Sequence, residues 1–239
     1  MAIEVRPVEY RLVGKTFEGM LAIDGKKSGK RPVVMVSHAW AGRTDYELDA
    51  AKRLAELGYA GFAIDLYGKG VVGTSTEENQ KLMTPLLEDR AALQALLVNA
   101  LDVAKELPEA DSARVAAMGY CFGGLCVLDL ARVGADLRGV ASFHGLLTPR
   151  GNTTGKWIKA KVAAYHGWDD PMATPETVVA LGKELTEAGA DWQIHAYGGV
   201  VHAFTNKAAN DPSFGAVYDV RADRRSWAAL VDFLKECFA

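Results

Sequence analysis

Short apolar runs alternate with amphipathic stretches along most of the chain. Apolar runs of this length, bounded by glycine or polar residues, are typical of buried strands. An entry hairpin is expected over Tyr10–Ile23. Further strands are expected at Arg31–Ser37, Tyr59–Asp65, Val115–Gly119, Gly139–Phe143, Val162–His166 and Trp192–Tyr197. Strands that alternate with helices predict an α/β fold whose central sheet is mostly parallel, with helices on both faces.

Helix boundaries can be predicted from capping residues. Thr44 and Glu47 match a capping box, and the helix that they open is expected to stop at Gly58. Pro175 fits the first turn of a later helix that Gly189 closes. The other helices are a long one with Leu93, Leu97, Ala100, Ala104 and Leu107 on one face, and a final one over Ala222–Phe238. Two polar segments are expected to be loops at a pocket entrance: Gly68–Pro85 and Thr205–Val220.

Composition narrows the class of protein. The chain has 239 residues, of which 49% are hydrophobic, so one domain over residues 1–239 with a full core is expected. A formal net charge of −3 gives no electrostatic basis for binding nucleic acid or an anionic membrane. No signal peptide and no transmembrane segment are expected from the pattern of apolar residues. Three cysteines do not suggest a disulfide framework, so a reducing cytoplasm is the expected location.

The candidate chemistry centres on Gly119-Tyr120-Cys121-Phe122-Gly123-Gly124, which joins a predicted strand to a predicted helix. This is the layout of a nucleophile elbow, with cysteine in place of the usual serine. The flanking glycines let the strand and helix backbones approach closely, and the helix N-terminus favours a thiolate. Free cysteine often only packs in a core, so Cys121 needs a base and an orienting acid to be a nucleophile.

An acid and a base follow in order, each just after a predicted strand. Functional residues of open α/β sheets gather at these strand ends. Asp169 and Asp170 follow the strand Val162–His166, and we prefer Asp170, which directly precedes a proline. His202 lies on the loop after Trp192–Tyr197. The order Cys121, Asp170, His202 predicts a catalytic triad, in which the acid orients the histidine.

Other residues have supporting roles in this hypothesis. The backbone N–H groups of Trp40 and Phe122 are expected to form an oxyanion hole. Tyr67 and Trp168 flank the predicted site and are candidates for substrate binding. The alternative is that each of them only packs against the rest of the protein. The remaining histidines are expected to be structural: His38, His144, His166 and His195. His166 and Asp169 are not part of a tight ligand cluster, so no metal is expected.

With these motifs in this order, the chain resembles the dienelactone hydrolase family of α/β-hydrolases. The resemblance spans nearly the whole chain and implies the α/β-hydrolase fold. It also implies a Cys-Asp-His hydrolase of esters or lactones that needs no metal or organic cofactor. The segments that carry it are Ala60–Gly68, Arg114–Gly124, His166–Pro171, His202-Ala203-Phe204 and Arg225-Ser226-Trp227.

The chain departs from the family pattern at two positions. A glutamate of the type enzyme, which contacts the nucleophile, is replaced by Ala39. An arginine that holds the substrate carboxylate is replaced by Asn206. Arg43 or Arg90 could substitute for this arginine, although both are expected to be solvated. The resemblance therefore implies the catalytic machinery more firmly than the substrate.

The expected function is hydrolysis of small carboxylic esters or lactones through the triad and a thioester intermediate. The expected partner is a small-molecule ester or lactone, and the protein is expected to be a monomer or homodimer. The alternative is a catalytically weak hydrolase-fold protein that binds a small ligand. A second enzymatic alternative is a peptidase that acts on small peptides.

Overall fold

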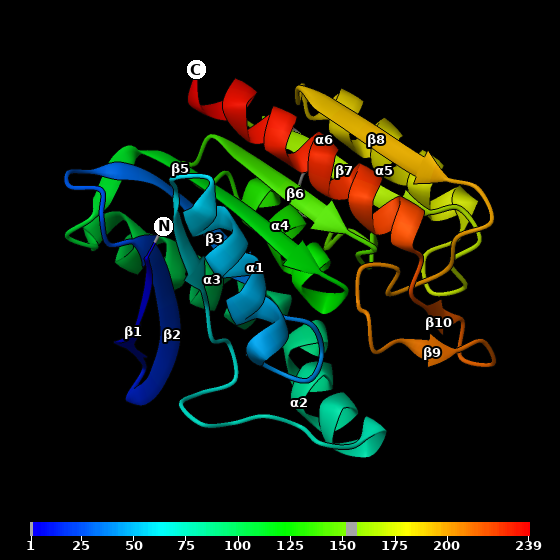
Figure 1. Ribbon diagram of the computed structural model, residues 1–239. Coiled ribbons are helices and arrows are strands. Elements are labelled where there is room, and N and C mark those ends of the chain that lie inside the picture. The colour runs from blue at the N-terminus through cyan, green and yellow to red at the C-terminus, as the bar shows by residue number, and fades with distance from the viewer. Residues whose placement is uncertain (1, 152–156) are drawn as a thin grey trace. The chain divides into compact units, whose positions relative to one another are not determined.

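A computed structural model describes residues 2–151 and 157–239 of the chain (Figure 1). The chain divides into two compact units, Met1–Met118 and Gly119–Ala239. Strand β5 (Ala110–Tyr120) runs across the boundary, so its last two residues belong to the second unit. The organisation as a single domain stays a prediction.

The first unit contains four neighbouring strands in the order β1-β2-β4-β3. The predicted entry hairpin is present, as an antiparallel pair of two long strands, and β2 is also antiparallel to β4. β3 and β4 are parallel and almost wholly buried, which explains their apolar sequences. The bounds of these strands are Ile3–Leu12 (β1), Lys15–Asp24 (β2), Arg31–Ser37 (β3) and Ala60–Ala63 (β4).

Three helices accompany these strands: α1 (Asp45–Glu56), α2 (Thr76–Glu88) and α3 (Arg90–Glu106). Figure 1 shows α1 in front of β3 and α3 behind it. The predicted capping box at α1 is confirmed, because the Thr44 N–H donates to Glu47 Oε2 at 2.8 Å and the Tyr46 N–H donates to Thr44 Oγ1 at 3.3 Å. Helix α1 is thereby fixed at its first residue, directly after the loop that follows β3.

The expectation of a loop over Gly68–Pro85 is wrong in its second half, where α2 begins at Thr76. Ser75 caps this helix, since its Oγ accepts the N–H of Glu78 at 3.2 Å. The Glu78 carboxylate reaches back to the Thr74 N–H at 2.8 Å. The sequence predicts a loop here because this segment is polar and contains Pro85. A proline is uncommon in the last turns of a helix, where Pro85 lies.

In the second unit, three parallel strands lie in the order β6-β7-β8, with the pairs Val140↔Val162 and Ala164↔Ile194 in register. Helix α6 lies in front of these strands and α4 and α5 lie behind them (Figure 1). The unit thus has helices on both faces of its strands. The bounds are β6 (Gly139–Phe143), β7 (Lys161–Gly167), β8 (Trp192–Tyr197), α4 (Phe122–Arg132), α5 (Pro175–Glu187) and α6 (Val220–Phe238).

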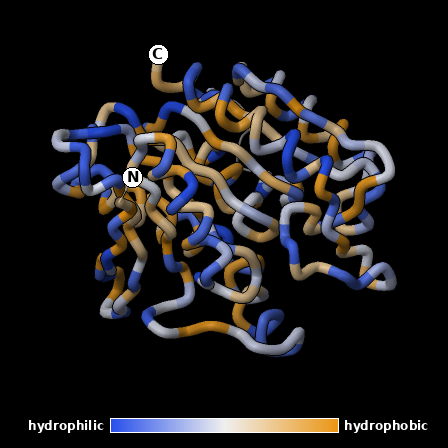
Figure 2. Tube along the Cα trace, in the orientation of Figure 1, coloured by the Kyte–Doolittle hydropathy of each residue, from blue (hydrophilic) through white to orange (hydrophobic). Residues whose placement is uncertain are grey.

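The final helix is amphipathic, as its sequence predicts. Hydrophilic and hydrophobic residues alternate along α6 in Figure 2, and Ala222, Ser226, Leu230 and Leu234 are buried at intervals of one turn. The segment before α6, expected to be a loop, contains the two-stranded sheet of β9 (Asn210–Asp211) and β10 (Ala216–Val217). His202 forms an isolated bridge to Ala216, which fixes the start of this segment.

The turn between β5 and α4 is as sharp as the sequence predicts. Cys121 has φ +54° and ψ −115°, outside the regions that most residues adopt. A Cβ at Gly119 would lie 2.1 Å from the Gly123 carbonyl oxygen, and one at Gly124 would lie 2.7 Å from the Cα of Gly145. Because both of these close approaches are to backbone atoms, neither can be relieved by a side-chain rotation.

We therefore expect Gly119→Ala to destabilise the protein by roughly 1–3 kcal/mol, as overpacking of a tight site does. Gly198→Ala is the matched control, because a Cβ there meets nothing within 4 Å. This control should be neutral or slightly stabilising. Urea unfolding of both variants measures the difference, and equal free energies of unfolding would show that the close approach does not constrain the turn.

Candidate active site

Cys121 stands at the N-terminus of α4 with its side chain partly exposed. Its N–H donates to the Phe143 carbonyl at 3.0 Å, which joins the turn to the end of β6. Its own carbonyl accepts the N–H of Gly124 at 3.0 Å and so begins the helix. The sulfur thus lies where the partial positive charge of a helix N-terminus favours an anion.

Asp170 and His202 come from the two loops that the sequence indicates, and the structure brings them together. The Nδ1 of His202 lies 2.7 Å from Asp170 Oδ2, and both side chains are buried. The other carboxylate oxygen of Asp170 accepts the Met172 N–H at 2.8 Å, which fixes the acid in the turn after β7. Asp169 is exposed, so the structure favours Asp170 of the two candidates as the partner of His202.

The backbone around His202 is also held in place. The His202 N–H donates to the Gly215 carbonyl at 2.9 Å, and its carbonyl accepts the Val217 N–H at 3.1 Å. The next residue, Ala203, has φ +57°, a conformation that non-glycine residues seldom adopt. This turn directs the imidazole inward while the main chain is tied to β10.

The charges around His202 favour its protonated form. Burial by itself lowers the pKa of the imidazole, but the charge of Cys121 and the hydrogen bond with Asp170 outweigh it and raise the pKa to about 10. Its Nε2 is buried and makes no well-formed hydrogen bond within the described residues. The ring is therefore bound to Asp170 at Nδ1, and Cys121 acts on it through its charge.

Two of the other histidines have a ring nitrogen close to the main chain. His38 and His166 are buried, and each has one ring nitrogen 2.7 Å from a backbone carbonyl, of Ala39 and Ala173 respectively. Burial lowers the pKa of both rings, against the opposing effect of nearby carboxylates. Both positions are consistent with the structural role expected for them.

In the first unit, the loop after β3 is held by a buried carboxylate. Oε1 of Glu47 accepts the N–H of Ala39 at 3.1 Å, in addition to the capping bonds of Oε2. The carbonyl of Trp40 in the same loop accepts the Tyr67 hydroxyl at 3.0 Å. The sequence predicted Glu47 as a capping residue, but not its second bond, because that bond depends on how the loop folds back.

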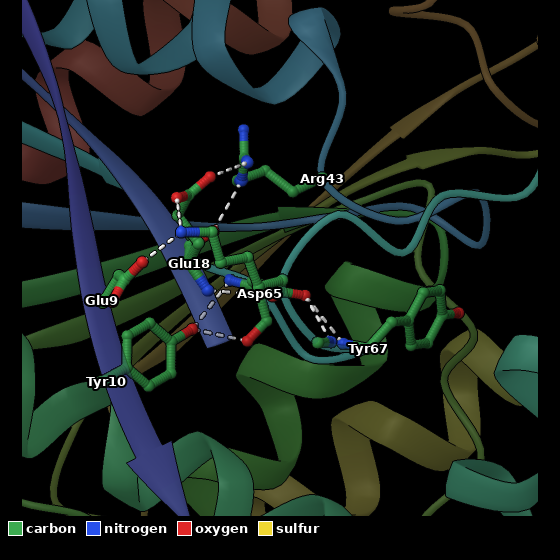
Figure 3. A network of polar contacts seen from close by, with 8 residues as sticks. Glu9, Tyr10, Glu18, Arg43, Asp65 and Tyr67 are labelled. Atoms are coloured by element: carbon green, nitrogen blue, oxygen red, sulfur yellow. Dashed lines mark hydrogen bonds and ion pairs between the residues drawn. The ribbon is translucent and has the colours of Figure 1, made fainter. Parts of the chain in front are cut away.

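Figure 3 shows a polar network that fixes the loop after β4. Oδ1 of Asp65 accepts the N–H groups of Tyr67 and Gly68 at 2.8 and 2.9 Å. Oδ2 accepts the Glu18 N–H at 3.0 Å, and the Tyr10 hydroxyl accepts the N–H of Asp65 at 2.8 Å. A single buried carboxylate thus ties the entry hairpin to the loop that carries Tyr67.

Arg43, expected to be solvated, is half-buried and engaged in this network (Figure 3). Its Nε donates to the Glu18 carbonyl at 2.8 Å, and its Nη2 lies 3.4 Å from the Glu18 carboxylate. Arg43 is therefore bound to Glu18 through both the main-chain carbonyl and the carboxylate. Asn206 uses its side-chain oxygen locally, to accept the Ala208 N–H at 3.0 Å.

Trp168, the second candidate for substrate binding, is 40% exposed. It lines a groove of about 570 Å³ with Val178 and Gly182 of α5 and Trp192 of β8. Within residues 2–151 and 157–239, no group of three or more His, Cys, Asp or Glu side chains is arranged to hold a metal ion. No helix in the same ranges is long and apolar enough to span a membrane.

The buried histidines predict how stability depends on pH. His38 and His166 have a lowered pKa in the folded protein, whereas in the unfolded chain the ordinary value of 6.5 applies. Below about pH 6.5 the unfolded chain therefore binds protons that the folded protein excludes. We expect the free energy of unfolding to fall by up to about 1.4 kcal/mol per pH unit for each such histidine.

His202 acts in the opposite direction, because its raised pKa adds stability that is complete below about pH 6.5 and is lost as the pH rises towards 10. Urea unfolding at pH 7.5 and 5.5 measures the acid limb. The double variant His38→Gln/His166→Gln should lower stability at pH 7.5 and make this limb less steep, while His144, which is also buried with a lowered pKa, still contributes to it. An equally steep limb in the double variant would assign it to other groups.

Comparisons with known proteins show the family of the chain. The family model described as "Dienelactone hydrolase family" matches residues 17–238. A curated relative from Aquifex aeolicus, named "Putative carboxymethylenebutenolidase", is 28% identical over 236 residues, which are 95% of this chain and 96% of the relative.

Solved structures match over the whole chain. The structure named m3DLH is 37% identical, with a TM-score of 0.95 and complete coverage of both chains. The dienelactone hydrolase-like promiscuous phosphotriesterase P91, from metagenomic libraries, is 35% identical, with a TM-score of 0.93 and 99% coverage of each chain. These matches confirm the α/β-hydrolase fold, with its mostly parallel sheet, and an enzyme of the hydrolase class. The chain belongs to the dienelactone hydrolase family.

Proposed function

We propose that the protein hydrolyses small carboxylic esters or lactones, with Cys121 as nucleophile, His202 as general acid and base, and Asp170 as the orienting acid. The observation that carries the proposal is the buried bond of 2.7 Å between His202 Nδ1 and Asp170 Oδ2. It leaves Nε2 available for proton transfer at Cys121, whose charge already raises the pKa of His202. This is the division of roles that a catalytic triad requires.

In the first half of the reaction, the Cys121 thiolate attacks the ester carbonyl and forms a tetrahedral oxyanion. As the oxyanion collapses, the carbon–oxygen bond of the leaving group breaks. The proton on His202 Nε2 passes to the departing oxygen, which leaves as an alcohol or, in an opened lactone, remains attached as a hydroxyl. The acyl group remains on sulfur as a thioester, and His202 is left neutral.

In the second half, the neutral Nε2 takes a proton from water as the water oxygen attacks the thioester carbonyl. The carbon–sulfur bond then breaks, and the carboxylic acid product leaves and releases its proton to the solvent. The thiolate is restored beside an imidazolium. Asp170 remains ionised and keeps Nδ1–H fixed throughout, which stabilises the charged ring in a buried place.

The oxyanion requires backbone donors, and we propose the N–H groups of Phe122 and Trp40. Phe122 is the first residue of α4, where helix N–H groups have no intrahelical acceptor. Trp40 belongs to the loop that Glu47 and Tyr67 restrain. Loss of one such donor typically costs about 2.7–4 kcal/mol of transition-state stabilisation.

The residues present favour uncharged substrates over a lactone that carries a carboxylate. The family arginine is replaced by Asn206, and Arg43 is engaged by Glu18. A substrate carboxylate would therefore lack the family arginine, and Arg43 is already paired with Glu18. We therefore expect neutral aryl esters and lactones to be better substrates, with Tyr67 and Trp168 as candidate contacts for the acyl or aryl group.

The first test is Cys121→Ala, assayed on aryl acetates and butyrates and on neutral and carboxylated lactones. We expect kcat/KM to fall by at least about 10³-fold, because loss of a triad nucleophile leaves only binding and oxyanion stabilisation. Cys237→Ala is the matched control, since it removes a different buried thiol, on α6, and should retain activity. Unchanged turnover in the Cys121 variant would rule out the mechanism.

A second measurement traps the intermediate. Acid quenching during turnover, followed by intact-mass spectrometry, should show the mass of the acyl group on Cys121. His202→Ala should lose turnover with the fold intact.

An ester and the matching amide assayed together distinguish an esterase from a peptidase, because amides need stronger protonation of the leaving group. A phosphotriester tests whether the side activity stated for P91 extends to this chain.

A further inference from the structure

A second histidine lies against His202, on the end of a different strand. His144 follows β6 directly and is buried. Its ring meets the His202 ring edge-to-face, with centroids 5.1 Å apart and planes at 69°. It meets Phe204 in the same manner, at 5.1 Å and 80°. His144 therefore packs against the predicted catalytic ring and against the loop that carries it.

The backbone of His144 is strained and firmly held. Its φ is +36°, which is unfavourable for a residue with a Cβ. Its N–H donates to the Tyr165 carbonyl at 2.8 Å, and the preceding carbonyl, of Phe143, accepts the Cys121 N–H at 3.0 Å. The same short segment thus contacts the turn of Cys121 through its backbone and His202 through its side chain.

A hydrogen bond links the ring of His144 to the His202 loop a second time. Its Nε2 lies 2.7 Å from Thr205 Oγ1, three residues beyond His202. Ala203, between them, has a positive φ of 57°, so the loop is tightly bent at this point. The ring contact and the hydrogen bond together restrain both ends of the bend.

The ionisable groups that act on His144 are His202 and His166, and the Tyr120 ring stacks on it at 5.9 Å. Burial, followed by the charge of His202, holds the pKa of His144 well below its usual range. The ring is thus uncharged at neutral pH and can pack against a His202 imidazolium without repulsion between like charges.

We propose that His144, through its ring contact and its bond with Thr205, is a positioning residue that keeps Nε2 of His202 directed at Cys121. The inference rests on the proposed triad, because it assigns His144 a role only through His202. Asp170 fixes the Nδ1 side of the imidazole, and His144 restrains the face and the loop. Without His144, the ring would remain bound to Asp170 but would turn about that bond.

The test uses two pairs of variants. Thr205→Val removes the hydroxyl at nearly constant shape, whereas Thr205→Ser keeps the hydroxyl and serves as its control. His144→Asn removes the ring but keeps a residue type that tolerates positive φ, so the fold should survive. His195→Asn is the matched control, because His195 is a half-buried histidine in the middle of β8 that bonds to Gln193.

The primary readout is the rate at which iodoacetamide alkylates Cys121, followed by mass spectrometry from pH 5 to 10. We expect Thr205→Val and His144→Asn to slow alkylation at pH 7 by about 10-fold, as a misplaced partner group does. Alkylation should recover at higher pH, because the thiolate then forms without help from His202. Thr205→Ser and His195→Asn should follow the wild-type profile.

The ester assay adds a second readout. Thr205→Val and His144→Asn should lower kcat by about 10-fold with little change in KM, since positioning acts on the chemical step. Wild-type alkylation and kcat in Thr205→Val would overturn the proposal, even if the variant were less stable, because His144 would then only pack. The proposed function is decided by a different result. If Cys121→Ala kept its esterase activity, the proposed function would fail, even if the alkylation profiles of the His144 and Thr205 variants still shifted.

Discussion

The sharp turn at Cys121 is the constraint on which the candidate site depends. A strand that enters a helix without a loop places one residue at the helix N-terminus, and here that residue has φ +54°. The turn is possible only because Gly119 can approach the Gly123 carbonyl more closely than any Cβ would allow. The strained conformation is held on its other side by the hydrogen bond to Phe143 at the end of β6.

The second constraint is the electrostatics of a buried imidazole. Burial disfavours a charged ring, so His202 can hold a proton only if opposite charges are close by. Asp170 is one of these charges and the Cys121 sulfur is the other, and their combined effect exceeds the cost of burial. Among the described residues, the charges that act on the adjacent His144 are those of other histidines, and burial keeps this ring neutral. Two adjacent histidines thus differ in charge because only one of them contacts an acid.

In the first unit, buried or half-buried side chains bind main-chain groups around the loops that follow β3 and β4. Glu47 lies on α1, beyond the loop that contains Ala39, yet its buried carboxylate binds the Ala39 N–H. Arg43, which the sequence left as a substitute for the missing arginine, is bound to Glu18. The loops after β3 and β4 are therefore held by internal carboxylates.

Much of this protein follows from its sequence alone, because local rules act over a few residues. Apolar runs predicted the buried strands, capping residues predicted α1, and the glycines around Cys121 predicted the turn. Helix α2 was missed because a polar, proline-containing helix has no apolar periodicity, although Ser75 and Glu78 form its cap.

The tertiary structure decided what depends on contacts distant in sequence. It distinguished Asp170 from Asp169 by burial, occupied Arg43 with Glu18, and brought His144 from β6 against His202. Such contacts depend on where loops from separate strands meet. Short-range sequence patterns cannot predict this, because the residues in contact are far apart in the chain.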